Sequence, residues 1–280
     1  MSKDTKKTLN CRGRLVDLTT PVVMGILNVT PDSFYPGSRI STGQIIETAG
    51  RMLADGATFL DVGGYSTRPG ASAVGPAEEA DRVLPAVEAI LDAFPAALIS
   101  VDTFRADVAR QAVEAGAGLV NDVAGGTLDP AMFATVAELG IPYVLMHLRG
   151  NPQTMQSLAQ YQNVLTDVMA ELSVCLAQLR ALGVKDVILD PGFGFAKTPA
   201  QNFELLRQLD AFDQFDEPLL VGLSRKTTVW KTLNITAEEA LNGTTVLNTV
   251  ALMKGAAILR VHDVHEAVES IRLTQALTFF

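Results

Sequence analysis

Leu98-Ile99-Ser100-Val101-Asp102 is a short apolar run that ends in an acid, and the same arrangement recurs along this 280-residue chain. There are eight such runs, and nearly every one ends in a polar side chain. They begin near residues 22, 57, 97, 118, 142, 186, 218 and 258. Runs rich in Val, Ile and Leu are typical of parallel strands that are buried on both faces. The sequence therefore predicts eight buried parallel strands.

The stretches between the runs mostly have the apolar spacing of amphipathic helices. The expected helices span residues 44–54, 76–94, 105–114, 130–138, 158–182, 199–209 and 237–254. Prolines lie in the first turn of three of them and glycines follow three of them, as is typical of helix ends: Pro76, Pro130, Pro199, Gly116, Gly140 and Gly183. Strands that alternate with helices in this way predict an α/β fold, a single (β/α)8 TIM barrel.

No low-complexity linker interrupts this alternation, so we expect one domain over residues 1–280, with residues 1–20 as an N-terminal lead-in. Two connections are longer than the usual 2–6 residues, namely residues 30–42 after the first strand and 63–75 after the second. Long connections at the carboxyl end of a barrel are typical of lids and substrate clamps.

Composition narrows the class of protein. The formal net charge of −9 argues against a nucleic-acid partner, which would require a basic face. Two cysteines are too few for a disulfide framework. The N-terminus lacks the apolar core of a signal peptide, and no apolar run approaches the ~20 residues of a membrane span. We therefore expect a cytoplasmic protein that does not associate with membranes.

Polar residues at the carboxyl ends of the strands predict one shared pocket. In the last run, Ile258, Arg260 and His262 fall on one face, which sets Arg260 and His262 ~7 Å apart. An Arg-x-His pair at this end of a barrel favours an anion, because Arg carries a fork of donors that suits phosphate oxygens. Asn28 ends the neighbouring first strand and is a candidate ligand for a Mg²⁺–phosphate group. A simple polar cap of that strand is the alternative.

A second group of polar residues suggests a ligand rich in hydrogen-bond donors. Asp102, Asn121 and Asp190 end three strands, and buried carboxylates need hydrogen-bonded or charged partners. An aminopyrimidinone ring fits such a group, with Lys226 donating to the carbonyl oxygen of the ring. Met146, Phe193 and Phe195 lie where a flat ring would stack. A structural network of ion pairs among Asp102, Asp190 and Lys226 is the alternative.

At these residues the chain resembles the dihydropteroate synthase family, over roughly residues 22–273. The first matching segment, Gly-Ile-Leu-Asn-Val-Thr-Pro-Asp-Ser-Phe at residues 25–34, is very specific, as is Gly-Leu-Ser-Arg-Lys at residues 222–226. Shorter matches follow the same order along the chain: Ser-Thr-Arg-Pro-Gly at 66–70, Ser-Val-Asp-Thr at 100–103, Asn-Asp at 121–122, Met-His at 146–147, Leu-Asp-Pro-Gly-Phe-Gly-Phe at 189–195 and Arg-Val-His-Asp at 260–263.

The resemblance implies a homodimeric TIM-barrel enzyme of folate biosynthesis that uses Mg²⁺. Its reaction joins p-aminobenzoate to 6-hydroxymethyl-7,8-dihydropterin diphosphate and releases pyrophosphate. The family's pterin pocket corresponds to Asp102, Asn121, Met146, Asp190, Phe195 and Lys226. Its diphosphate and Mg²⁺ site corresponds to Asn28, Arg68, Arg260 and His262. Its p-aminobenzoate pocket, which sulfonamides also occupy, corresponds to Phe34, Thr67, Pro69, Lys226 and Thr227. Asp102, Lys226 and Arg260 are the expected catalytic residues.

Two positions depart from the family pattern. Tyr65 stands where the family usually has Glu, and Pro36 stands where it usually has an Asp of the first loop. Asp32 is the nearest carboxylate to that second position. These departures put the action of the loops in doubt, but not the pterin and anion sites.

Two other functions are the rivals. One is a pterin barrel that transfers a methyl group from methyltetrahydrofolate to a corrinoid protein, which has no need of a diphosphate site. The other is an inactive pterin-binding paralogue, against which the presence of Asp102, Lys226, Arg260 and His262 argues.

Overall fold

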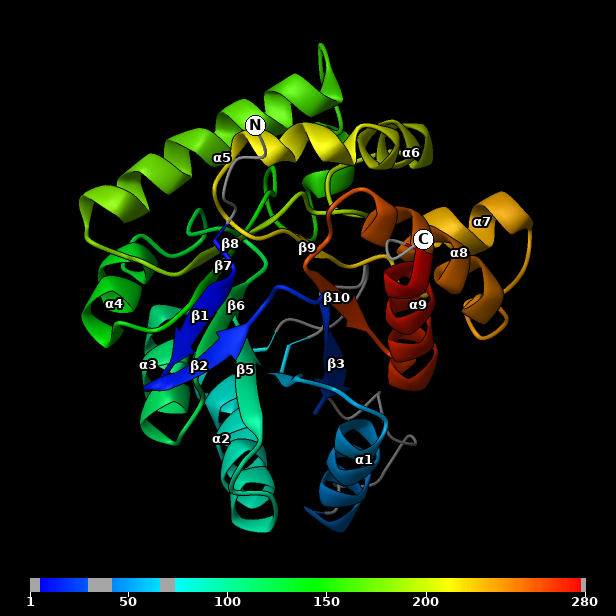
Figure 1. The fold of residues 1–280 in the computed structure, drawn as a ribbon. Coiled ribbons are helices and arrows are strands. Elements are labelled where there is room, and N and C mark those ends of the chain that lie inside the picture. The colour runs from blue at the N-terminus through cyan, green and yellow to red at the C-terminus, as the bar shows by residue number, and fades with distance from the viewer. Residues whose placement is uncertain (1–5, 30–41, 66–73, 278–280) are drawn as a thin grey trace.

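The computed structural model describes residues 6–29, 42–65 and 74–277. Its central sheet has eight parallel strands in the order β8-β7-β6-β5-β4-β3-β10-β9. The strands are β3 (Val22–Asn28), β4 (Phe59–Gly63), β5 (Leu98–Asp102), β6 (Leu119–Asp122), β7 (Tyr143–Met146), β8 (Val187–Asp190), β9 (Leu220–Val221) and β10 (Ile258–Val261). All eight expected strands are present, and helices surround them (Figure 1).

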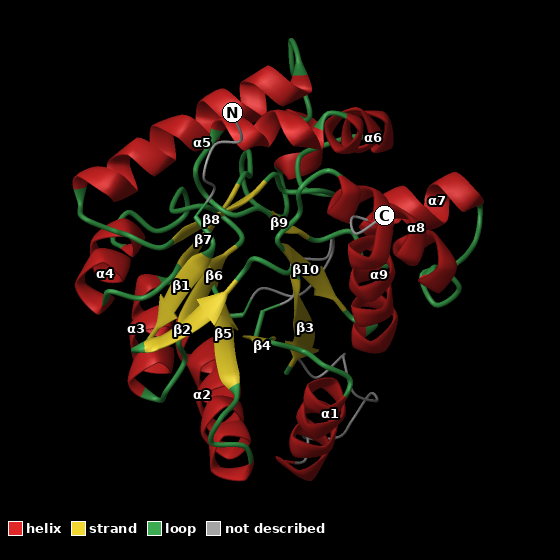
Figure 2. Ribbon diagram, viewed as in Figure 1, coloured by secondary structure: helices red, strands yellow, loops and turns green. Residues whose placement is uncertain are grey.

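A contact between the two outer strands closes the sheet. Leu189 of β8 forms a parallel bridge with Leu219, which directly precedes β9. The backbone N–H of Leu189 also donates to the carbonyl of Pro218 at 2.9 Å. The prediction of a (β/α)8 TIM-like barrel is confirmed, with yellow strands at the centre of a ring of red helices in Figure 2.

All seven expected helices are present, with shifted ends. The helices are α1 (Thr42–Ala54), α2 (Pro76–Ala93), α3 (Ala106–Glu114), α4 (Met132–Leu139), α5 (Val164–Ala181), α6 (Pro199–Arg207), α7 (Thr227–Leu233), α8 (Leu241–Met253) and α9 (Val264–Leu277). Helix α5 begins at Val164 rather than at residue 158, because the Asn163 side chain caps it by accepting from the N–H of Thr166. Helices α7 and α9 were not predicted.

The inner face of the barrel changes from apolar to polar along the strands. Each strand contributes one buried apolar residue to a lower layer: Met24, Phe59, Leu98, Leu119, Val144, Ile188, Leu220 and Ile258. Side chains two positions further along a strand point to the same face. Five of the eight positions above this layer carry charged or hydrogen-bonding groups, namely Asp61, Ser100, Asn121, Asp190 and Arg260. We call these five residues the polar layer.

A β-hairpin seals the amino end of the barrel. Strands β1 (Thr8–Cys11) and β2 (Arg14–Asp17) pair in antiparallel fashion within the expected lead-in segment. Leu9, Cys11, Val16 and Leu18 of this hairpin belong to the same buried cluster as the apolar lower layer. Figure 1 shows the blue hairpin lying across the barrel strands. Among the described residues, the polar layer faces the opposite end, where we expect the chemistry.

The two long connections predicted after the first and second strands lie largely outside the described residues. So do four predicted site residues, Phe34, Thr67, Arg68 and Pro69. Across the described ranges, every helix is too short or too polar to cross a membrane.

Candidate active site

Arg260 joins two acids at the centre of the polar layer. Its Nε donates to Asp61 Oδ2 at 2.6 Å, and its Nη2 donates to Asp102 Oδ2 at 2.5 Å. Burial disfavours the guanidinium charge, but Asp61 and Asp102 outweigh this effect and raise the pKa of Arg260 above its usual value. Two carboxylates thus share one cation in the interior of the barrel.

The two acids differ in their other partners. Asp61 is fully buried and also accepts hydrogen bonds from Ser100 Oγ at 2.5 Å and from Asn121 Nδ2 at 2.9 Å. Asp102 is mostly buried, and among the described residues Arg260 is the charged side chain that offsets the cost of its burial. That burial raises the pKa of Asp102 well above its usual range, with Arg260 acting in the opposite direction and Asp61 in the same one. Asp102 is therefore the candidate to face a ligand, and Asp61 is the more fully paired partner of Arg260.

Sequence reasoning overlooked Asp61 as part of the site. A signal existed, because Asp61 follows Phe59 by two positions, as Ser100 follows Leu98. The register of β4 against β5 pairs Phe59 with Leu98 and Asp61 with Ser100, so both polar residues point into the barrel.

Lys226 and Asp190 form the opposite side of the same mouth. Lys226 Nζ donates to the carbonyl of Phe193 and lies 4.6 Å from the centre of the Phe195 ring. Burial lowers the pKa of Lys226 to about 8, and Asp190 acts against this shift. Burial raises the pKa of Asp190, while Lys226 is the largest opposing influence. The structure thus brings together these predicted residues of the pterin pocket.

The remaining described residues of the predicted pockets lie around this mouth. Met146 is buried and belongs to a small apolar cluster against which Phe195 packs. Asn28 is half-buried at the end of β3, where its side-chain oxygen lies near Gly63. Thr227 is exposed at the first position of α7.

Two glycines line the mouth of the barrel. A Cβ at Gly63 would lie 3.3 Å from Asp102 Cβ and 3.6 Å from the Asn28 side-chain oxygen. A Cβ at Gly222 would lie 3.6 Å from Lys226 Nζ and 3.9 Å from Arg260 Cβ. Both glycines stand at inward positions between groups that are candidates to bind a ligand.

His262 is oriented by Ser224. The Ser224 Oγ accepts the backbone N–H of His262 at 3.1 Å and lies 2.9 Å from His262 Nδ1. Ser224 therefore contacts both the backbone and the ring of His262 and fixes the position of the ring. The inward direction of Arg260 agrees with the alternation read from the sequence.

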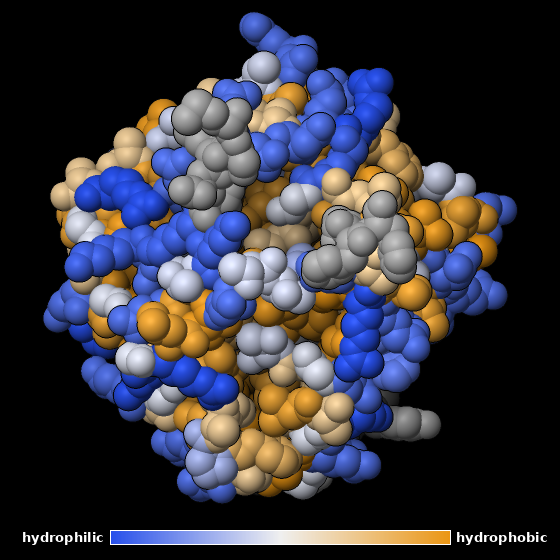
Figure 3. Space-filling view, in the orientation of Figure 1, coloured by the Kyte–Doolittle hydropathy of each residue, from blue (hydrophilic) through white to orange (hydrophobic). Residues whose placement is uncertain are grey.

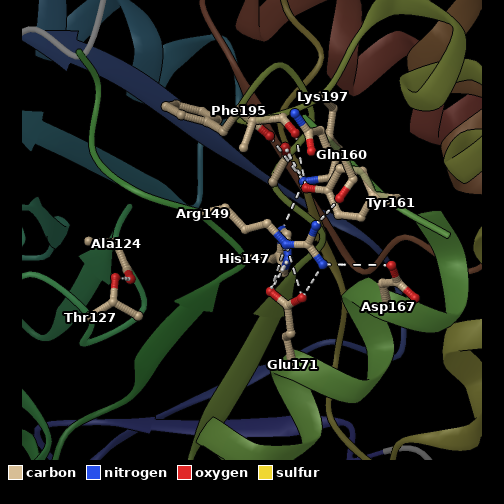
Figure 4. A network of polar contacts seen from close by, with 12 residues as sticks. Ala124, Thr127, His147, Arg149, Gln160, Tyr161, Asp167, Glu171, Phe195 and Lys197 are labelled. Carbon is tan, nitrogen blue, oxygen red and sulfur yellow. Dashed lines mark hydrogen bonds and ion pairs between the residues drawn. The ribbon is translucent and has the colours of Figure 1, made fainter. Parts of the chain in front are cut away.

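Two strand-end residues point away from the barrel interior. Asp122 accepts from the Tyr143 hydroxyl at 2.7 Å and from the backbone N–H groups of Ala124 and Gly126 at 2.8 and 2.7 Å. It therefore orders the turn after β6. His147 packs among Glu171, Lys197 and Tyr161 on the outer side of β7 (Figure 4).

Within the ranges that the structure describes, no three His, Cys, Asp or Glu residues form a metal cluster. Mg²⁺ needs only one or two protein oxygens when substrate phosphates supply others. The side-chain oxygen of Asn28, which lies close to Asp102 across Gly63, fits such a site.

Comparisons with known proteins identify the family. The family described as "Pterin binding enzyme" matches residues 24–262. A dihydropteroate synthase of Escherichia coli (strain K12) is 43% identical over 271 residues, which cover 96% of this chain and 95% of the relative.

Solved structures agree with the relatives. The Yersinia pestis dihydropteroate synthase in complex with a sulfonamide drug superposes with a TM-score of 0.92 at 42% identity, covering 98% of this chain and 100% of that one. The Xanthomonas albilineans dihydropteroate synthase with 4-aminobenzoic acid gives 0.92 at 38% identity, covering 99% and 100%. The chain therefore belongs to the pterin-binding enzyme family and, within it, to the dihydropteroate synthases, the transferases of folate biosynthesis.

Proposed function

We propose that the polar layer and the residues around it bind 6-hydroxymethyl-7,8-dihydropterin diphosphate and join its methylene carbon to the amine of p-aminobenzoate. The observation that carries this proposal is the Asp61–Arg260–Asp102 arrangement at the open end of a barrel whose other end is sealed. It provides a buried cation and an incompletely paired acid within reach of one ligand.

The pterin ring is proposed to lie between Met146 and Phe195. Asp190 accepts from the ring N–H and exocyclic amine, Asn121 adds an amide, and Lys226 donates to the carbonyl oxygen of the ring. The lowered pKa of Lys226 and the raised pKa of Asp190 support this, because a ligand that pairs with both groups relieves the cost of their burial.

The chemical step breaks the bond between the methylene carbon and the diphosphate oxygen, and both electrons leave with the diphosphate. The cation that remains is delocalised into the dihydropterin ring. Asp102, ionised beside Arg260, stabilises this developing charge where water is scarce. The amine lone pair of p-aminobenzoate then forms the new C–N bond, and the amine loses a proton to solvent.

The leaving diphosphate is proposed to bind Arg260, His262 and Arg68. The contacts of Arg260 with the two acids engage Nε and Nη2, and Nη1 is the nitrogen proposed to reach the diphosphate. With Asn28 as its protein ligand, Mg²⁺ would neutralise part of the diphosphate charge when bound.

The second pocket is proposed to combine Lys226 and Thr227 with Phe34, Thr67 and Pro69 of the two long connections. The solved relative that holds 4-aminobenzoic acid supports this choice of ligand for the chain. Sulfonamides are expected to compete for the same pocket, in keeping with the solved complex of the Yersinia pestis relative.

Residues 1–280 are proposed to act as one domain in a cytoplasmic homodimer. Support for a dimer comes from large apolar side chains that α8 and α9 leave exposed: Val246, Met253, Leu273 and Leu277. Orange, hydrophobic atoms also gather over α7 and α8 in Figure 3. Met253→Glu should shift the chain toward monomers in sedimentation experiments.

A coupled assay of pyrophosphate release tests the reaction. Release should require the pterin diphosphate and should rise when p-aminobenzoate is added. A methyltransferase-type barrel or an inactive pterin-binding protein would release no pyrophosphate under either condition.

A further inference from the structure

A second polar network lies outside the site and begins at the surface. Arg149 binds Glu171 with two of its nitrogens, Nε at 3.0 Å and Nη2. Glu171 Oε2 lies 3.0 Å from His147 Nε2, and His147 Nδ1 lies 3.0 Å from Lys197 Nζ. Figure 4 shows this chain of contacts running from Arg149 through His147 to Lys197.

The order of the contacts fixes the direction of the hydrogen bonds. A carboxylate only accepts, so neutral His147 donates from Nε2 to Glu171, and Nδ1 is left to accept from Lys197. Burial lowers the pKa of His147 to about 4, with Lys197 the next cause, which keeps the ring neutral. Burial likewise lowers the pKa of Lys197, to about 7. Three acceptors nevertheless surround Lys197 Nζ, namely His147 Nδ1 and the carbonyls of Gly192 and Phe195. They match the three N–H groups of an ammonium.

Lys197 is the last residue of this network, and it lies on the loop after β8 that also carries Phe195 of the proposed pterin pocket. Its Nζ donates to the carbonyl of Gly192 at 3.0 Å and to that of Phe195 at 3.1 Å. The Tyr161 hydroxyl holds the next carbonyl, that of Ala196, at 2.9 Å, and the Arg149 guanidinium lies 4.0 Å from the centre of the Tyr161 ring. In Figure 4 the Phe195 ring points away from these contacts.

The loop needs such support because its backbone is unusual. Gly192, Gly194 and Ala196 all have positive φ, at 71°, 81° and 47°. For alanine this conformation carries a cost, since a Cβ clashes there with the backbone. The contacts of Lys197 and Tyr161 lie on either side of this residue, so they offset the strain and define where the Phe195 ring can stand.

We propose that Lys197 is a positioning residue for pterin binding: held by His147 and Glu171, it fixes the Phe195 backbone so that the ring is already in place to stack. The inference rests on the pterin pocket proposed above, and it assigns a role to residues that do not touch the substrate.

A double-mutant cycle tests this role. The dissociation constant of 6-hydroxymethylpterin is measured by calorimetry for the unmodified chain, Lys197→Met, Phe195→Ala and the double variant. Lys197→Met should weaken binding at least about tenfold when Phe195 is present and less than about threefold when Phe195 is replaced. An equal loss in both backgrounds would show that Lys197 does not act through Phe195 and would overturn the inference.

Lys6→Met is the matched control. Lys6, like Lys197, donates to a backbone carbonyl; it pairs in addition with Asp186 and lies at the sealed end of the barrel. It should change stability without changing pterin affinity. If Lys197→Met does not fold, Glu171→Gln takes its place in the cycle with a smaller expected loss, about threefold, that must again depend on Phe195.

The outcomes separate the inference from the proposed pocket. Normal pterin affinity in Phe195→Ala would reject the stacking role of that ring, and the inference with it. Weak binding in Phe195→Ala together with normal binding in Lys197→Met would reject the inference and leave the pocket standing.

Discussion

At the scale of single residues, the site depends on how two acids divide one guanidinium. Asp61 accepts hydrogen bonds from three neighbours and is fully buried, so its role is to hold Arg260 in place. Within the described ranges Asp102 pairs with Arg260 and keeps a raised pKa, so it should gain most from a ligand that carries positive charge. This division gives the two carboxylates different consequences on substitution.

Asp61→Asn should destabilise the fold by about 3–5 kcal/mol, because the buried charge of Arg260 would keep one of its two carboxylate partners, Asp102. Urea unfolding monitored by circular dichroism measures the change. Ser100→Ala removes one hydrogen bond from the same carboxylate and should cost only about 1 kcal/mol. Similar losses for the two variants would contradict the structural role of the Asp61 charge.

Asp102 and Asp190 should separate in steady-state kinetics. Asp190→Asn removes a ground-state contact and should mainly raise KM for the pterin substrate. Asp102→Asn removes a contact that strengthens as the cation develops and should mainly lower kcat. Initial rates at varied pterin diphosphate distinguish the two patterns, and a purely KM effect of Asp102→Asn would reject its role in the chemical step.

At the scale of elements, the amino-terminal hairpin contributes to stability, whereas the carboxyl ends of the strands carry the proposed catalytic groups. Leu9 of β1 is completely buried against the lower layer of the barrel, whereas Leu15 of β2 is 71% exposed. Leu9→Ala should cost about 2–5 kcal/mol in unfolding free energy and leave KM unchanged. Leu15→Ala is the matched control in the same hairpin and should stay within about 0.5 kcal/mol. Chemical denaturation and initial rates provide both readings, and a raised KM in Leu9→Ala would contradict the division.

The strands were predictable because each is a short apolar run with its own polar end. The hairpin was not, because its turn gives a weak signal. Arg12 and Gly13 both have positive φ, at 55° and 85°, which is the two-residue turn that normally selects Asn-Gly. An arginine at the first turn position hid a pairing that the alternation of Leu9 and Cys11 otherwise supports.

The inward acids and Arg260 followed from strand alternation, but the network behind Phe195 did not. His147, Glu171 and Lys197 come from a strand end, a helix and a loop, and no fixed spacing in the sequence relates them. Only the closed barrel brings them together. The position of Tyr65 is also explained by packing, because its ring meets Phe104 edge-on at 5.2 Å.

At the scale of the whole molecule, the buried network around His147 makes a contribution to stability that acid should remove. The folded pKa of His147, about 4, lies below the ~6.5 of an unfolded histidine, so the unfolded chain binds more protons between these values. A hydrogen bond from His147 lowers the pKa of Glu171 to about 2, which acts in the same direction at lower pH. The contribution of His147 to the unfolding free energy should therefore fall by about 2 kcal/mol between pH 6.5 and 4.5, whereas Asp102, whose folded pKa is raised, contributes in the opposite direction over this range.

Urea unfolding at the two pH values measures this loss. His147→Gln should remove this contribution from the pH dependence, whereas His265→Gln should not, because His265 is exposed on α9. An unchanged slope in His147→Gln would show that the acid sensitivity arises elsewhere.

The amino-terminal hairpin also affects how substrate enters and product leaves the barrel. In the part of the chain that the structure describes, Leu9 and the apolar layer close one end of the barrel, so we expect the pteroate product to leave by the end through which the next pterin enters. Departing product and arriving substrate then exclude each other. At high product concentration, turnover should slow because the product competes with the pterin diphosphate. This inhibition would follow from the closed end of the barrel rather than from any one contact.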